Sequence, residues 1–201
     1  NFCKISTENR TKIGWISTWN TRCGIATYSE HLLSEIKEDY IIFSPNDNDT
    51  SDEKVIRCWN LGDDNLESLF NEIISNNITS IVVQFNYGFF DFKCFANFIK
   101  AIYSKNIKII IFLHSTIDPK SDKSKILSDI KDVLYLSHRI LVHTPSDLNR
   151  LKDIGLVKNV SLFPHGVLDL DVQRTDYQYP KYSKNVIHFS TYGFCLPNKG
   201  F

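Results

Sequence analysis

The chain has 201 residues, of which 42% are apolar and 13% aromatic, enough to build the core of one full domain. Lysine plus arginine and aspartate plus glutamate both number 23, so the formal net charge at pH 7 is zero. Proteins that bind nucleic acid usually carry a basic surplus, so nucleic acid is not an expected partner. No apolar run approaches the roughly 18 residues that a membrane-spanning helix needs.

The five cysteines lie far apart in the sequence, and no C-x-x-C pair occurs. This spacing argues against a disulfide framework and against a structural zinc site, and it favours the reduced thiols of a cytoplasmic protein. We therefore expect no metal. The chain begins with Asn1 and contains no methionine, so we expect it to be a piece of a longer protein.

Apolar, β-rich runs alternate with segments of helical periodicity along the chain. The segment 12–34 shows the pattern best, because a short apolar run leads through a polar turn directly into a helical repeat. The predicted strands lie near 12–17, 40–44, 55–59, 80–85, 108–114, 139–143, 160–163 and 186–190. The predicted helices lie near 25–38, 64–76, 92–105, 123–136 and 146–154.

This alternation predicts an α/β fold, a Rossmann-like parallel sheet with helices on both faces. The runs 80–83 and 109–112 are nearly continuous in apolar residues, which is typical of central strands buried on both sides. No G-x-G-x-x-G and no P-loop sequence occurs, so the usual dinucleotide and P-loop interpretations lack support.

Polar, aromatic and glycine residues follow several predicted strands at their carboxyl ends, where open parallel sheets bind ligands. Such a mixture suits a hydroxyl-rich ligand, because amides and imidazoles make hydrogen bonds while aromatic faces cover apolar surface. Each residue also has a structural alternative, such as a hydrogen bond within the core or the shaping of a turn. The residues concerned are Asn20, Arg22, Cys23, Gly24, Gln84, Asn86, Tyr87, His114 and His143, with His165 predicted to shape a turn.

Six stretches of the chain together resemble a known family. They are 14–33, 82–90, 111–116, 139–151, 162–167 and 190–201, and they are similar, in the same order, to motifs of GT-B glycosyltransferases of the family-4 (group 1) type. The resemblance implies a retaining enzyme of polysaccharide biosynthesis that moves a sugar from a nucleotide-sugar donor to a saccharide or lipid-linked acceptor. It implies no cofactor besides the nucleotide-sugar substrate.

The resemblance also assigns roles to residues. It implies a catalytic His114 beside the donor sugar, and donor binding by the loop of Arg22, Cys23 and Gly24 and by Lys199, which would neutralise the leaving diphosphate. The acceptor-binding residues that we predict are Asn20, Gln84, Asn86, Tyr87 and His143.

The same resemblance predicts the domain organisation. Residues 1–168 form an acceptor-side Rossmann-like domain, 169–184 a linker, and 185–201 the first strand and turn of the donor-binding domain, which would be the partner of the first domain. The family's arginine near the end of this stretch is replaced by Phe194, and its paired glutamates would lie beyond Phe201. We therefore expect these 201 residues to be inactive by themselves.

Two other functional classes stay open at this stage. The first is a non-catalytic carbohydrate-binding or interaction domain with a GT-B-derived fold, which Phe194 favours slightly. The second is a related enzyme such as a sugar-nucleotide epimerase, for which the sequence offers few acid/base pairs. Peripheral contact with the inner face of the membrane is a further alternative, although the segment 93–105 is only modestly basic.

Overall fold

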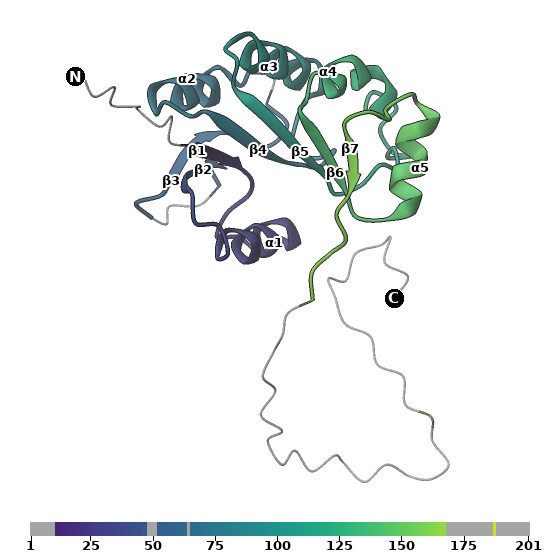
Figure 1. The fold of residues 1–201 in the computed structure, drawn as a ribbon, viewed down its shortest axis with the longest axis horizontal. Coiled ribbons are helices and arrows are strands. Elements are labelled where there is room, and N and C mark those ends of the chain that lie inside the picture. Colours follow the sequence, from purple (N-terminus) through teal and green to yellow (C-terminus); the bar gives the residue numbers. More distant parts are fainter. Residues whose placement is uncertain (1–10, 48–51, 64, 168–186, 188–201) are drawn as a thin grey trace, which may run out of the picture. The chain divides into compact units, whose positions relative to one another are not determined.

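A single parallel sheet organises the chain. The computed structural model describes residues 11–47, 52–63, 65–167 and 187. Within these residues seven strands, all parallel, lie in the order β3-β2-β1-β4-β5-β6-β7 (Figure 1). The strands are β1 (Lys12–Ile16), β2 (Asp39–Pro45), β3 (Val55–Trp59), β4 (Ser80–Phe85), β5 (Lys108–Leu113), β6 (Arg139–Val142) and β7 (Val160–Leu162).

Helices connect most of the strands and cover the sheet. They are α1 (Gly24–Leu33), α2 (Glu67–Ser75), α3 (Phe92–Ser104), the 3₁₀ turn η1 (Leu127–Ile130), α4 (Lys131–Tyr135) and α5 (Pro145–Asp153). The strand order reverses its direction between β1 and β4, which creates the crevice at which such sheets commonly bind ligands. The predicted α/β architecture is thus confirmed.

The two faces of the sheet carry separate apolar clusters. The larger one joins the sheet to α2, α3, α4 and α5, and its fully buried members include Leu69, Phe85 and Phe95. The smaller one lies under α1 and contains Trp15 and Phe112. Figure 1 shows α1 on the opposite side of the sheet from α2, α3 and α4. Burial of these side chains is the main favourable term in folding.

Three helices end where the local sequence supplies an asparagine or a glycine. Asn77 and Asn106 adopt left-handed φ values of 55° and 57° after α2 and α3, and Gly155 a φ of 87° after α5. Asparagine and glycine are the residues that tolerate this conformation at helix carboxyl ends. In two of these helices the amide after the left-handed residue donates back into the helix, from Ile78 to the Ile73 carbonyl and from Leu156 to the Leu151 carbonyl.

Two helices are shorter than the sequence predicts. The helix expected over 25–38 ends at Leu33, and only η1 and α4 form within 123–136. In the second case side chains hold the preceding segment in a loop, because Asp118 Oδ1 accepts the Leu127 amide at 2.9 Å and Lys125 Nζ donates to the Tyr87 carbonyl at 2.7 Å. Helical periodicity alone does not reveal such competing bonds.

The chain divides into two units, Asn1–His165 and Gly166–Phe201, and the first contains every strand and helix given above. The predicted linker and the predicted start of a second domain, with Phe194 and Lys199, lie outside the described residues except for Ile187. The predicted domain assignment therefore stays a prediction. Among the described helices, none combines the length and the apolar character needed to cross a bilayer.

Candidate ligand-binding site

Four polar side chains meet at the carboxyl edge of the sheet. Gln84 lies near the end of β4, His114 follows β5, His143 follows β6, and His165 lies just beyond β7. Phe112 belongs to the apolar cluster under α1, and side chains two residues apart on a strand share a face, which explains why His114 lies on the α1 side. We call these four residues, together with Tyr28 of α1, the histidine site.

Tyr28 lies at the centre of this site. Its ring centroid is 5.2 Å from that of His114, 5.4 Å from that of His143 and 5.3 Å from that of His165, and each pair meets edge to face. His143 and His165 stack with their centroids 3.9 Å apart, while His114 and His143 lie 5.1 Å apart. The three histidines and the tyrosine thus form one packed cluster that joins α1 to three neighbouring strands.

Two hydrogen bonds determine the tautomers of His114 and His143. His114 Nε2 lies 2.7 Å from Gln84 Oε1, and because an amide oxygen only accepts, the imidazole N–H donates. His143 Nδ1 donates in the same way to the Phe163 carbonyl at 2.9 Å. In its neutral form His143 therefore presents Nε2 as a hydrogen-bond acceptor.

Hydrogen-bonding capacity remains unused around His114. Within the described part of the chain, His143 Nε2, Gln84 Nε2 and the Tyr28 hydroxyl are buried and have no partner. Gln84 is fully buried and His143 is 8% exposed. Buried polar atoms are nearly always paired in native proteins, so three unpaired ones around a single imidazole need an explanation.

Burial disfavours the charged forms of His114, His143 and Tyr28. Burial, together with repulsion from the neighbouring His143 and His165 rings, lowers the pKa of His114 to about 3. Burial also lowers the pKa of His143 and raises that of Tyr28 to about 12. A general acid or base works best with a pKa near the operating pH, so His114 and Tyr28 are suited to hydrogen bonding rather than to proton transfer.

The other predicted site residues lie elsewhere. Asn20 and Arg22 line a cavity beside α1, while Cys23 and Gly24 form the amino-terminal start of that helix. A Cβ at Gly24 would meet nothing within 4 Å, so the backbone there does not require glycine. A diphosphate-binding role for this loop stays a prediction.

Asn86 and Tyr87 have structural partners that sequence reasoning missed. Asn86 Oδ1 accepts the Gly88 amide at 2.9 Å and so shapes the turn after β4. The Tyr87 hydroxyl donates to Asp118 at 2.9 Å, and its ring belongs to the core on the face opposite α1. The structure therefore does not bring Tyr87 to the histidine site.

Tyr28 and His165 are the site residues that the sequence did not reveal. The helical spacing of Tyr28 shows only that it faces the sheet, and His165 was predicted to shape a turn with its neighbours. Among the described residues, no group of three or more histidine, cysteine, aspartate or glutamate side chains could hold a metal ion. The cluster is therefore a set of stacked, hydrogen-bonding rings.

Comparisons with known proteins give no family. No family model matches the chain, and no curated protein matches it. One similar solved structure is the spore cortex-lytic enzyme SleL of Bacillus megaterium QM B1551, with a TM-score of 0.38 and 9% sequence identity. The match covers 76% of this chain and 49% of that one, so the chain spans about half the length of that structure.

These comparisons contradict the resemblance to GT-B glycosyltransferases. No family model supports it, and the similar structure named above is a cortex-lytic enzyme rather than a glycosyltransferase. The predictions of a glycosyltransferase, of nucleotide-sugar chemistry and of polysaccharide biosynthesis are therefore wrong, and the GT-B-derived carbohydrate-binding alternative fits no better. Among the described residues, the matching stretches are strands with the turns or helices that follow them, and proteins of unrelated function share such α/β elements.

Proposed function

We propose that this protein binds a small uncharged molecule bearing hydroxyl or amide groups at the histidine site. The observation that carries the proposal is the unused hydrogen-bonding capacity of His143 Nε2, Gln84 Nε2 and the Tyr28 hydroxyl. Leaving a buried polar group unpaired costs about 1–3 kcal/mol, and a bound ligand removes that cost.

The three groups define what the ligand must offer. The Gln84 amide nitrogen is a donor and needs an acceptor on the ligand, whereas His143 Nε2 accepts and needs a ligand O–H or N–H. The Tyr28 hydroxyl can do either. A hydroxyl or a primary amide supplies both functions in one small group, which matches this mixture of donors and acceptors.

The absence of charge at the site selects against ions. The low pKa of His114 keeps it neutral at pH 7, and the cluster as defined contains no aspartate, glutamate, lysine or arginine. Moving an ion out of water without a counter-charge is costly, so an uncharged ligand is favoured over an anion or a cation. Because the unpaired atoms are buried and His165 is exposed, a ligand reaches them when the His165 ring moves away from His143.

Titrations monitored by NMR of ¹⁵N-histidine-labelled protein would test the proposal. Glucose, uridine and acetamide serve as uncharged probes, and acetate and inorganic phosphate as charged ones. Glucose is included as a hydroxyl-rich probe, the ligand type that the polar and aromatic residues at the strand ends suggest. We expect at least one uncharged probe to shift the His143 Nε2 resonance, because that nitrogen gains a donor.

Variants separate binding at the site from binding elsewhere. His143→Phe and Gln84→Leu should abolish the response, since each removes one unpaired group while keeping a side chain of similar bulk. His31→Phe is the matched control, because His31 is exposed on α1 and outside the cluster. A response confined to the charged probes, no response to any probe, or an equal response in His143→Phe would contradict the proposal.

We also propose that the protein works in a reducing compartment such as the cytoplasm. Cys23 and Cys58 form no disulfide, and burial raises the pKa of the Cys58 thiol to about 12, which keeps it protonated and unreactive. A count of free thiols in denaturant, on protein purified without reductant, would test this.

A further inference from the structure

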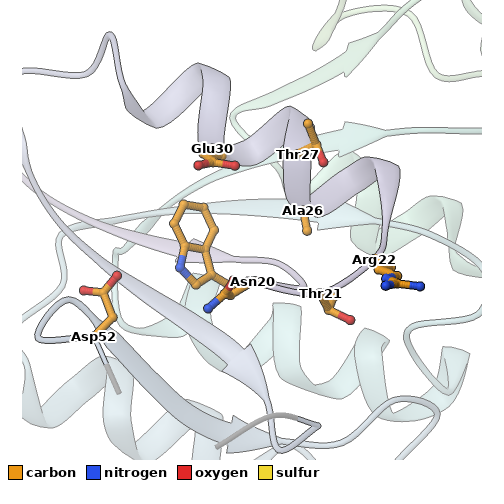
Figure 2. A pocket seen from close by; sticks show the side chains of 8 residues that line it. Asn20, Thr21, Arg22, Ala26, Thr27, Glu30 and Asp52 are labelled. Atoms are coloured by element: carbon orange, nitrogen blue, oxygen red, sulfur yellow. The ribbon is translucent and has the colours of Figure 1, made fainter. Parts of the chain in front are cut away.

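The cavity beside α1 that Asn20 and Arg22 line shares no residue with the histidine site. Its volume is about 680 Å³, within the range of small-molecule sites. The lining comes from the loop after β1, from one side of α1 and from Asp52, which precedes β3. Figure 2 shows Arg22 toward one end of this lining and the carboxylates of Glu30 and Asp52 toward the other.

The opposite charges in the cavity do not neutralise each other. Within the described part of the chain, neither Arg22 nor Glu30 has an ion pair or a side-chain hydrogen bond. Among the described residues, the Asp52 carboxylate accepts only the Lys54 amide, at 3.0 Å. One guanidinium and two carboxylates therefore face the same space with capacity left for a ligand.

Helix α1 separates the backbone positions that carry Arg22 and Glu30. Gly24, the first residue of α1, lies six residues before Glu30, which corresponds to about 9 Å along the helix axis, and Arg22 comes before the helix. The two charges of an α-amino acid sit on one carbon and cannot span this distance. An extended peptide advances about 3.3–3.6 Å per residue, so two or three residues span it.

The cavity wall between Arg22 and the two carboxylates suits an extended peptide. Trp19 is half-buried and Ala26 is buried, so both offer apolar surface, while Thr27 adds a hydroxyl. An aromatic ring beside carboxylates is also favourable for an ammonium group. The cavity thus combines an anion-binding end, an apolar wall and a cation-binding end.

We propose that this cavity binds an extended zwitterion, a short peptide with free termini or a linear ω-amino acid of similar length. Its carboxylate pairs with Arg22, and its ammonium group pairs with Glu30 and Asp52. Charged groups at both ends of an extended chain are the shared chemistry of the two ligand types.

Trialanine titrated into the ¹⁵N-labelled full chain tests the proposal. We expect amide shifts along residues 19–30 and none for trialanine that is acetylated and amidated at its ends. Arg22→Gln and Glu30→Gln should each weaken binding roughly fivefold to tenfold or more, since a charge-assisted hydrogen bond contributes somewhat more than a neutral one. Lys100→Gln and Glu35→Gln, at exposed positions outside the cavity, should bind as the unaltered chain does.

The other ligands and variants in this titration decide whether the proposal holds. If the ω-amino acid binds as tightly as trialanine, the cavity recognises the separation of the two charges alone. If trialanine binds more tightly, the ligand is a peptide. No binding, binding of the blocked peptide or of free alanine with equal affinity, or loss of binding in only one of the two charge variants overturns the proposal. Because these variants leave the histidine site intact, failure here is independent of the function proposed above.

Discussion

At the scale of single residues, Gly14 is the position where the sheet tolerates no side chain. A Cβ built there would lie 2.9 Å from Phe43 Cε2 and 3.0 Å from Ile78 Cγ2, and both neighbours are buried. Gly14→Ala therefore forces a buried ring to move. We expect a loss of about 1–3 kcal/mol in the free energy of unfolding, measured by urea denaturation.

Gly24 provides the control for that prediction. A Cβ there meets nothing within 4 Å, and alanine favours a helix more than glycine does, so Gly24→Ala at the first residue of α1 should leave stability unchanged or raise it by up to about 1 kcal/mol. Equal destabilisation by the two substitutions would show that the crowding around Gly14 is not the cause.

At the scale of elements, a buried carboxylate joins α5 to the loop after β5. Asp147 Oδ1 accepts from Thr116 Oγ1 and from Arg150 Nη2, each at 2.7 Å. Asp147 and Thr144 also form a reciprocal capping box at the start of α5. One side chain thus fixes the helix start and a neighbouring loop together.

The substitution Asp147→Asn tests the value of this network. Burial raises the pKa of Asp147, but the hydrogen bonds from Thr144, Thr116 and Arg150 outweigh it and lower the pKa overall. A lowered pKa contributes stability that is present above the unfolded-state pKa and is lost as the pH falls. We expect the variant to lose about 1–3 kcal/mol at neutral pH in urea denaturation and much less at acidic pH.

Asp153→Asn serves as the matched change on the same helix. Asp153 is exposed in the last turn of α5, where a negative charge opposes the helix dipole, so its removal should be neutral or slightly stabilising. If Asp147→Asn lowered the free energy of unfolding no more than Asp153→Asn does, the Asp147 network would not stabilise the fold.

Element types were predictable because local signals and burial agree. The apolar runs at β4 and β5 became central strands, and the helix predicted near 146–154 formed as α5 (Pro145–Asp153). The late start of the helical segment at η1 was not predictable, because the Leu127 amide donates to the distant side chain of Asp118.

At the scale of the whole molecule, the fold determines which strand-end residues can meet. Gln84, His114 and His143 were predicted to gather at the carboxyl edge, and the structure brings them together. Tyr87 was grouped with them but packs on the face opposite α1, since the face alternates along a strand and a list of strand ends ignores that alternation. The place of Tyr28 depends on how α1 docks on the sheet, which no local pattern specifies.

The neutral histidine cluster should make the whole fold acid-sensitive. The folded pKa of His114 is about 3, below its ordinary value of 6.5, so between these values the unfolded chain binds more protons than the folded chain. Stability should therefore fall as the pH drops through this window, by up to about 1.4 kcal/mol per pH unit for each such histidine. Urea denaturation from about pH 7.5 to about pH 4.5 would measure this slope.

An NMR titration of the folded protein would identify the group responsible. The His114 ring signals should show no protonation down to about pH 4. His31→Gln should keep the slope of stability with pH, and His114→Gln should reduce it, because it removes a proton-binding group that only the unfolded chain can protonate. A His114 ring that titrates near pH 6.5 would mean that solvent reaches the cluster. His143 Nε2, the acceptor on which the proposed ligand binding depends, would then no longer be buried and unpaired.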